Sequence, residues 1–252
     1  MRKFVVAALA ALICIALASV AMAQGAPATA ELTIKPSKAG TKSKPKAISL
    51  TLSVKNNVPA TTAERIDILL PRMVRISGKG LASCVKKKLG ADGITACPSK
   101  SKAGQGFANA LINPTAVQPP PTKLRFKVTA FVGGPSSVLF YLQEVNSQTN
   151  AVIPGGVVRT IEGKVGRASG SAYYQRLRID IPKDLQEPSD NVFSALQDLK
   201  TSLKLKKGKN SLLTSIGCKS KKHQLGVVID YADNPNPPPV PSSAGSDTAK
   251  CS

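Results

Sequence analysis

The sequence predicts an all-β fold, a β-sandwich of roughly ten antiparallel strands in a jelly-roll or immunoglobulin-like arrangement. Apolar residues alternate with polar ones along most of the chain, and apolar spacing of helical period is scarce. Turn-forming stretches such as Gly133-Gly134-Pro135 and Pro154-Gly155-Gly156 separate the alternating segments. Short strands at regular spacing favour a sandwich over a fold in which strands and helices alternate.

Each predicted strand has one apolar face. In residues 48–54 the apolar side chains of Ile48, Leu50, Leu52 and Val54 alternate with Ser and Thr, so one face of the strand is expected to be buried. The same pattern, with varying clarity, predicts strands at 31–35, 48–54, 66–70, 106–112, 124–132, 137–143, 157–161, 172–181, 196–205 and 225–231. Short helical turns are expected at 84–89 and 184–190.

The first 23 residues have the order of a secretory signal peptide. Arg2 and Lys3 precede an apolar run from Phe4 to Val20, and Ala21-Met22-Ala23 has the small-residue pattern of a cleavage site. A membrane anchor is the alternative, because the run is close to the lower limit of about 17 residues for a span. The small residues favour cleavage near Ala23, which predicts a signal helix that is removed and a secreted or cell-envelope-associated mature protein without a transmembrane segment.

The composition divides the chain into four parts. We expect a signal peptide at 1–23, a basic N-terminal segment with the first strand at 24–46, the β-sandwich domain at 47–233 and a proline-rich C-terminal tail at 234–252. The tail is predicted because Pro235 and Pro237 to Pro239 cannot donate the backbone hydrogen bonds of a regular strand.

Four cysteines follow the predicted signal peptide: Cys84, Cys97, Cys218 and Cys251. An even number of cysteines in an oxidising compartment predicts disulfides. Three pairings are possible, and proximity in sequence favours Cys84 with Cys97 and Cys218 with Cys251. We expect no metal site, because the chain has no C-x-x-C pair and a single histidine.

The chain is strongly basic. Its formal net charge is +21, and removing Arg2 and Lys3 leaves +19, which favours anionic partners such as a cell-wall polymer or an acidic polysaccharide. Nucleic acid fits less well, because the chain has no Trp and only 4% aromatic residues for stacking on bases. The alternative is that the lysine runs are solvated loops that keep an exported protein soluble. The candidate lysines for a binding patch are Lys86, Lys87, Lys88, Lys204, Lys206, Lys207, Lys209, Lys219, Lys221 and Lys222.

The loop Cys97-Pro98-Ser99-Lys100-Ser101-Lys102-Ala103-Gly104-Gln105-Gly106 resembles an element of a group of exported actinobacterial β-rich proteins. These share a Cys-Pro followed by Ser-Lys-x-Gly-x-Gly at the entrance to a strand. Further matching features here are Leu70-Pro71, Gly217-Cys218 and Tyr231-Ala232-Asp233-Asn234-Pro235. The resemblance implies a secreted or envelope-associated β-rich protein, and it supplies no catalytic residue.

Catalytic patterns in the sequence are weak. A Ser/His/Asp hydrolase would have to use His223 as its base, and no Gly-x-Ser-x-Gly element is present to hold the nucleophile. Ser99-x-x-Lys102 and Ser189-Asp190-Asn191 match two motifs of penicillin-recognising enzymes, but the third, Lys-Thr-Gly, is missing. We therefore expect no catalytic residue and no cofactor.

Together these observations predict a non-enzymatic binding or structural protein outside the cytoplasm that contacts an anionic polymer through lysine-rich loops. The alternative is an exported hydrolase or a carbohydrate-binding accessory module. A concave site with convergent polar groups would indicate an enzyme, whereas a binding module needs only a basic face.

Overall fold

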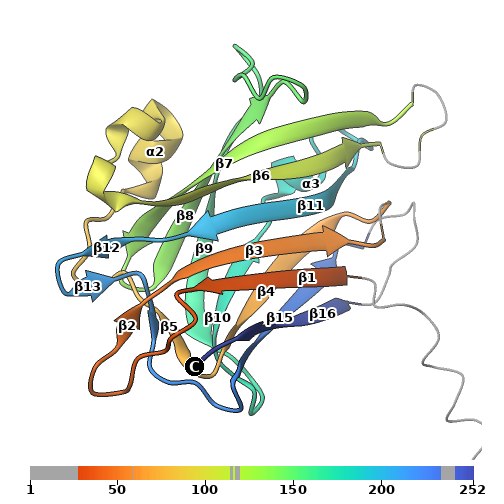
Figure 1. The fold of residues 1–252 in the computed structure, drawn as a ribbon. Coiled ribbons are helices and arrows are strands. Elements are labelled where there is room, and N and C mark those ends of the chain that lie inside the picture. The colour runs from red at the N-terminus through yellow and green to blue at the C-terminus, as the bar shows by residue number, and fades with distance from the viewer. Residues whose placement is uncertain (1–27, 59, 114–115, 117–119, 234–241) are drawn as a thin grey trace, which may run out of the picture.

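The computed structural model describes residues 28–252 except 59, 114–115, 117–119 and 234–241 (Figure 1). The predicted signal peptide lies outside the described residues. Within them, the prediction of an all-β fold is confirmed, because eleven strands form one continuous sheet in which every neighbouring pair is antiparallel. In spatial order the sheet contains β1 (Ala28–Lys35), β3 (Ser49–Asn56), β11 (Ser194–Leu203), β6 (Lys102–Ile112), β7 (Thr122–Gly134), β8 (Ser137–Val145), β9 (Val158–Arg167), β10 (Tyr173–Asp180), β4 (Ala63–Pro71), β15 (Lys222–Tyr231) and β16 (Ser243–Lys250).

The ten predicted strands all fall on strands of this sheet. The predicted helical turns coincide with α2 (Lys86–Asp92) and α3 (Lys183–Gln186). Five short strands form two small sheets: β2 (Lys46–Ala47), β14 (Leu213–Ser215) and β5 (Val74–Ile76) in one, β12 (Lys206–Lys207) and β13 (Asn210–Ser211) in the other. No helix in the described part of the chain is long and apolar enough to cross a membrane.

The large sheet curls until its two edge strands, β1 and β16, lie side by side (Figure 1). The backbone N–H of Leu32 in β1 donates to Oδ2 of Asp247 in β16 at 2.6 Å. The close approach requires Gly245, since a Cβ there would lie 2.6 Å from the carbonyl oxygen of Ala28. The sheet therefore encloses the main core, and its opposite parts face each other across it.

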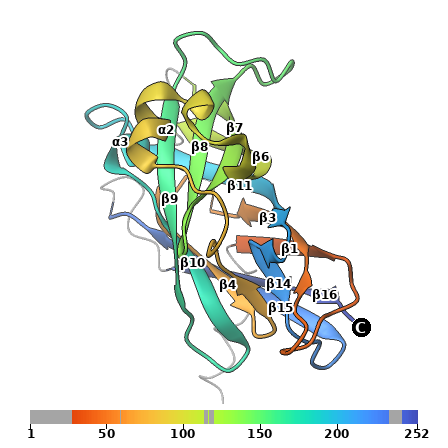
Figure 2. The same ribbon diagram turned by 90° about the vertical axis from the view of Figure 1, so that its left-hand side faces the viewer.

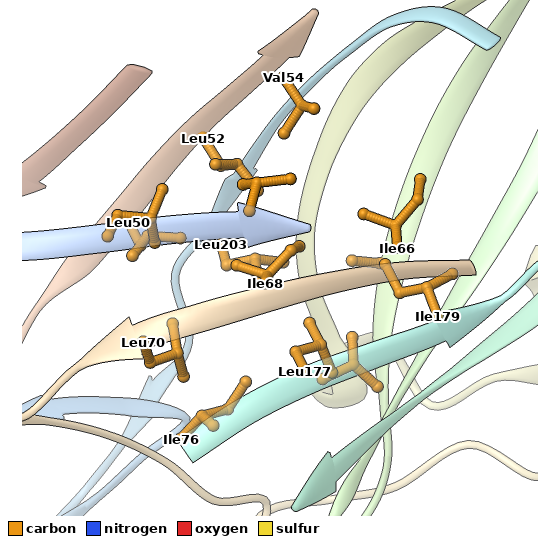
Figure 3. Packing of buried hydrophobic residues seen from close by; sticks show 14 of the residues in the cluster. Leu50, Leu52, Val54, Ile66, Ile68, Leu70, Ile76, Leu177, Ile179 and Leu203 are labelled. Carbon is orange, nitrogen blue, oxygen red and sulfur yellow. The ribbon is translucent and has the colours of Figure 1, made fainter. Parts of the chain in front are cut away.

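The main core consists of the apolar residues that alternate along these strands. Leu50 and Leu52 of β3 are 2% and 1% exposed, and they face Ile66, Ile68 and Leu70 of β4 across the interior (Figure 3). Burying such a side chain contributes about 1.5–3 kcal/mol, so the period-two pattern supplies most of the driving force for folding.

A second, smaller core lies outside the main one. Leu89 is the buried residue of α2, and it packs with Phe131 of β7 and with Leu139 and Tyr141 of β8. The disulfide between Cys84 and Cys97 belongs to the same cluster. A seven-residue helix is too short to be stable alone, so this packing and the disulfide hold α2 against the sheet.

The C-terminal segment differs from the predicted tail. Residues 243–250 form β16, which pairs with β15 from Ile229↔Ser243 to Lys222↔Lys250. The sequence SAGSDTAK lacks apolar alternation because few of its side chains face the core; only Ser243 and Ala249 are buried. The strand is held instead by backbone pairing, by its contact with β1 and by the following Cys251.

Candidate functional site

The antiparallel order places alternate connections at opposite ends of the sheet. One end contains residues 35–46, 72–102, 164–173, 203–222 and 250–252, and we call it the lysine-rich end. It carries α2, the β12–β13 hairpin and the β2–β14–β5 sheet, and Figure 2 shows α2 in front of β8 and β9. The second end contains residues 55–63, 112–123, 145–159, 180–194 and 230–243, apart from those the structure leaves out, and we call it the opposite end.

Charge is divided unequally between the two ends. Residues 35–46 contain five Lys or Arg, 72–102 contain eight, 164–173 contain two, 203–222 contain seven, and Lys250 completes the set of 23. Asp92 is the single acidic residue in these segments. The opposite end has four Lys or Arg and six Asp or Glu in the segments that define it. The positive charge of the folded chain is therefore concentrated at one end.

The ten predicted lysines all lie at the lysine-rich end, and all are exposed. They form three groups around it instead of one patch: on α2, on and beside the β12–β13 hairpin, and between Cys218 and the start of β15. Among the residues that the structure describes, Lys86 is the one member of the ten with a carboxylate at ion-pair distance, 3.8 Å from Oε2 of Glu162. The other nine ammonium groups therefore have no carboxylate partner in the described chain.

Local structure explains how the hairpin lysines are presented. Lys206 and Lys207 pair with Ser211 and Asn210, and Gly208 at the turn has a φ of 56°, which glycine adopts without strain. Nδ2 of Asn210 donates to the carbonyl oxygen of Gly80 at 2.9 Å, so the hairpin is attached to the loop that precedes α2.

The two disulfides formed in the structure are those that sequence proximity favoured. Cys84 pairs with Cys97, with 5.0 Å between their Cα atoms, and Cys218 pairs with Cys251 at 5.8 Å. Each bond anchors one lysine group: the first encloses α2, and the second ties residues 219–222 to the end of β16. The lysine-rich end is thus cross-linked twice.

The residues of the catalytic patterns do not converge. His223 is 3% exposed at the start of β15, and burial lowers the pKa of its imidazole. Ser99 and Lys102 lie at the lysine-rich end, at the start of β6, whereas Ser189-Asp190-Asn191 lies at the opposite end. The two motifs are therefore separated by the length of the sheet.

A cavity of about 240 Å³ lies at the opposite end, between α3 and the inner faces of β6, β7, β8 and β9. Its walls are almost wholly apolar, with side chains such as Phe126, Leu142 and Ile161. Leu124, Leu142, Val157 and Leu196 are only half-buried, so the cavity opens to solvent. Sequence analysis missed this cavity.

The polar residues of the cavity are engaged with one another or with the backbone. Nε of Arg159 donates to Oδ2 of Asp184 at 2.5 Å, and Nη1 of Arg159 donates to the carbonyl oxygen of Val158. The hydroxyl of Ser194 donates to the carbonyl oxygen of Leu185 in α3. Arg159 and Asp184 thus neutralise each other at the rim, and Ser194 is bonded to the backbone, so the three do not form a nucleophile, base and oxyanion donor around one point.

No family model matches the chain, and no curated protein matches it in sequence. A solved structure described as "AvmM Catalyzes Macrocyclization in Alchivemycin A Biosynthesis" aligns with a TM-score of 0.30 at 6% identity, covering 90% of this chain and 88% of that one. A likeness at this level carries no argument about fold or activity.

Proposed function

We propose that the chain is a secreted or cell-envelope-associated, non-enzymatic protein that binds an anionic polymer through its lysine-rich end. The polymer would be a phosphate-bearing wall polymer or an acidic polysaccharide. The observation that carries the proposal is the gathering of 23 Lys and Arg with one acidic residue at one end. A concentrated field of one sign attracts and orients polyanions, whereas charge spread evenly would serve only solubility. The location outside the cytoplasm rests on the signal-peptide pattern of residues 1–23.

The geometry gives less support to a hydrolase. The cavity has the concave shape that a catalytic site needs, but Arg159 and Asp184 at its rim are paired with each other. Of the remaining candidates, His223 and Ser99-x-x-Lys102 lie at the other end of the sheet, and Ser189-Asp190-Asn191, which follows Pro188 at the cavity, contributes no lining residue. A rigid scaffold with exposed lysines fits a binding protein better.

A charge-reversal pair tests the proposal. The triple variant Lys206→Glu, Lys207→Glu and Lys209→Glu changes the β12–β13 hairpin. The matched control, Lys55→Glu, Lys123→Glu and Lys200→Glu, makes the same change in net charge at exposed positions away from the lysine-rich end. Binding to heparin and to polyphosphate is measured by titration calorimetry between 50 and 200 mM salt. Circular dichroism and thermal melting verify that both variants fold.

We expect the hairpin variant to bind at least about tenfold more weakly at low salt and the control to stay within about threefold of the parent. Log K falls as log salt rises, and each lost phosphate contact makes this slope shallower by roughly 0.7. The loss of three contacts therefore makes it shallower by about 2. Equal losses in both variants would show that only net charge matters. Binding that does not change with salt would exclude an electrostatic site.

A further inference from the structure

The cavity at the opposite end results from small residues on the inner face of the sheet. Ala63, Ala108 and Ala110 line it, whereas the middle of the core is filled by Leu and Ile side chains. Native interiors are normally packed so tightly that voids larger than a water molecule are few. An apolar space of about 240 Å³ that opens to solvent is therefore a site where a ligand can bury hydrocarbon.

The surface beside the opening is apolar as well. Val152, Ile153 and Val158 are 46%, 38% and 37% exposed, and they lie in the connection from β8 to β9 and at the start of β9. Two neighbours of Val158 along the chain, Val157 and Arg159, line the cavity. Val152, Ile153 and Val158 are three of the six large apolar side chains that are exposed in the described chain. Val158 itself points to the outer face of β9, where it lines a hollow with Lys86 and Lys87, so a ligand that extends beyond the opening would cover Val152 and Ile153 only.

The electrostatics of the opening determine the class of ligand. Arg159 is the one basic residue among the described residues that line the cavity, and its guanidinium is already paired with Asp184 instead of being free to hold a carboxylate or a phosphate. The segments of this end contain more acidic than basic residues, which disfavours an anionic head group further. The ligand is thus expected to be uncharged.

We propose that this cavity binds an uncharged aliphatic molecule with a chain of about ten carbon atoms, taken up from solution. The length follows from volume: a cavity of roughly 150 Å³ holds the six carbons of benzene, so 240 Å³ holds about ten. A hydroxyl or carbonyl at one end of the chain would stay at the rim, near Arg159 and Ser194. The cavity is enclosed by the inner faces of the strands, whereas Lys86 and Lys87 of α2 lie on the outer side of β9 beside Arg159. The inference does not depend on polymer binding.

The experiment uses the mature protein and an uncharged fluorescent probe, N-phenyl-1-naphthylamine, whose emission rises in apolar surroundings. Decan-1-ol and decanoate are compared as competitors, and thermal melting is recorded with each. The variant Ala110→Phe places a phenyl group in the cavity, where it takes more than half of the volume. The control Ala91→Phe adds the same group at an exposed position of α2.

We expect decan-1-ol to displace the probe, to raise the melting temperature, and to bind at least about tenfold more tightly than decanoate. Ala110→Phe should weaken probe binding at least about tenfold, and Ala91→Phe should leave it unchanged. If Ala110→Phe does not fold, protection of the parent protein by decan-1-ol against thermal melting decides the question alone. The proposal is overturned if decan-1-ol gives no such protection, if both variants bind the probe equally, or if decanoate binds more tightly than decan-1-ol. It is also overturned if the protein binds phosphatidylcholine vesicles but not dissolved decan-1-ol.

Discussion

Removing the disulfide between Cys218 and Cys251 should destabilise the protein strongly. The bond joins residues 33 positions apart, and the chain-entropy relation for a loop of this size gives about 4 kcal/mol of stabilisation. The same relation gives about 3 kcal/mol for Cys84 and Cys97, which are 13 positions apart. Cys251 also holds the end of β16, whose own sequence buries little apolar surface. The double variant Cys218→Ala and Cys251→Ala should therefore lose about 4 kcal/mol of unfolding free energy.

The assay is urea unfolding of the parent and of the double variant, followed by circular dichroism. The dependence of unfolding free energy on urea should also become steeper, because an unfolded chain without the cross-link exposes more surface. Peptide mapping without reductant tests the pairing directly. A loss below about 1 kcal/mol, or a peptide that links Cys84 to Cys218, would refute the reasoning.

Two further predictions concern the sheet itself. Asp67 accepts hydrogen bonds from Nε and Nη2 of Arg178, both at 2.9 Å. Burial opposes ionisation of Asp67, but the hydrogen bonds and the charge of Arg178 outweigh burial. The pKa of the Asp67 carboxyl is therefore lowered below its ordinary 3.8. Its contribution is therefore complete above about pH 4 and is lost as pH falls through the lowered pKa. Asp67→Asn should cost about 1–3 kcal/mol at pH 7 in urea unfolding, and the difference from the parent should shrink as the pH falls below about 4. Gly245→Ala should open the contact between β1 and β16, where the new Cβ meets the Ala28 carbonyl, and cost about 1–3 kcal/mol with faster hydrogen exchange in β1. Gly166→Ala is the control, since a Cβ there finds no atom nearer than 3.9 Å, and an equal loss in both glycine variants would contradict the explanation.

The strands were predictable where one face is buried. Leu50, Leu52 and Val54 alternate with polar residues because β3 has the core on one side and solvent on the other. β16 escaped prediction because it is an edge strand that packs on β1 through Gly245, where larger side chains do not fit. A sequence pattern based on apolar alternation cannot detect such a strand.

The two ends of the molecule were predictable only in part. Sequence identified the lysine runs at 35–46, 86–88, 204–209 and 219–222. That they share one set of connections depends on strand direction, because alternate connections of an antiparallel sheet lie at the same end of the strands. Counting connections along the predicted strands would have revealed this. The cavity could not be found in the same way, because Ala108 and Ala110 leave space only in relation to the strands opposite them.

The length of the strands separates the lysines of the β12–β13 hairpin from the cavity. β15 contains ten residues, which corresponds to about 33 Å at roughly 3.3 Å per residue. Electrostatic interactions in physiological salt decay over about 8 Å, so the lysines at the far ends of the strands have little influence on the cavity. Lys86 and Lys87 of α2 are the exception, because they line a surface hollow together with Arg159 and Asp184. If the chain binds a polymer as proposed, substitutions of the lysines on the β12–β13 hairpin should change that binding and leave the cavity unchanged.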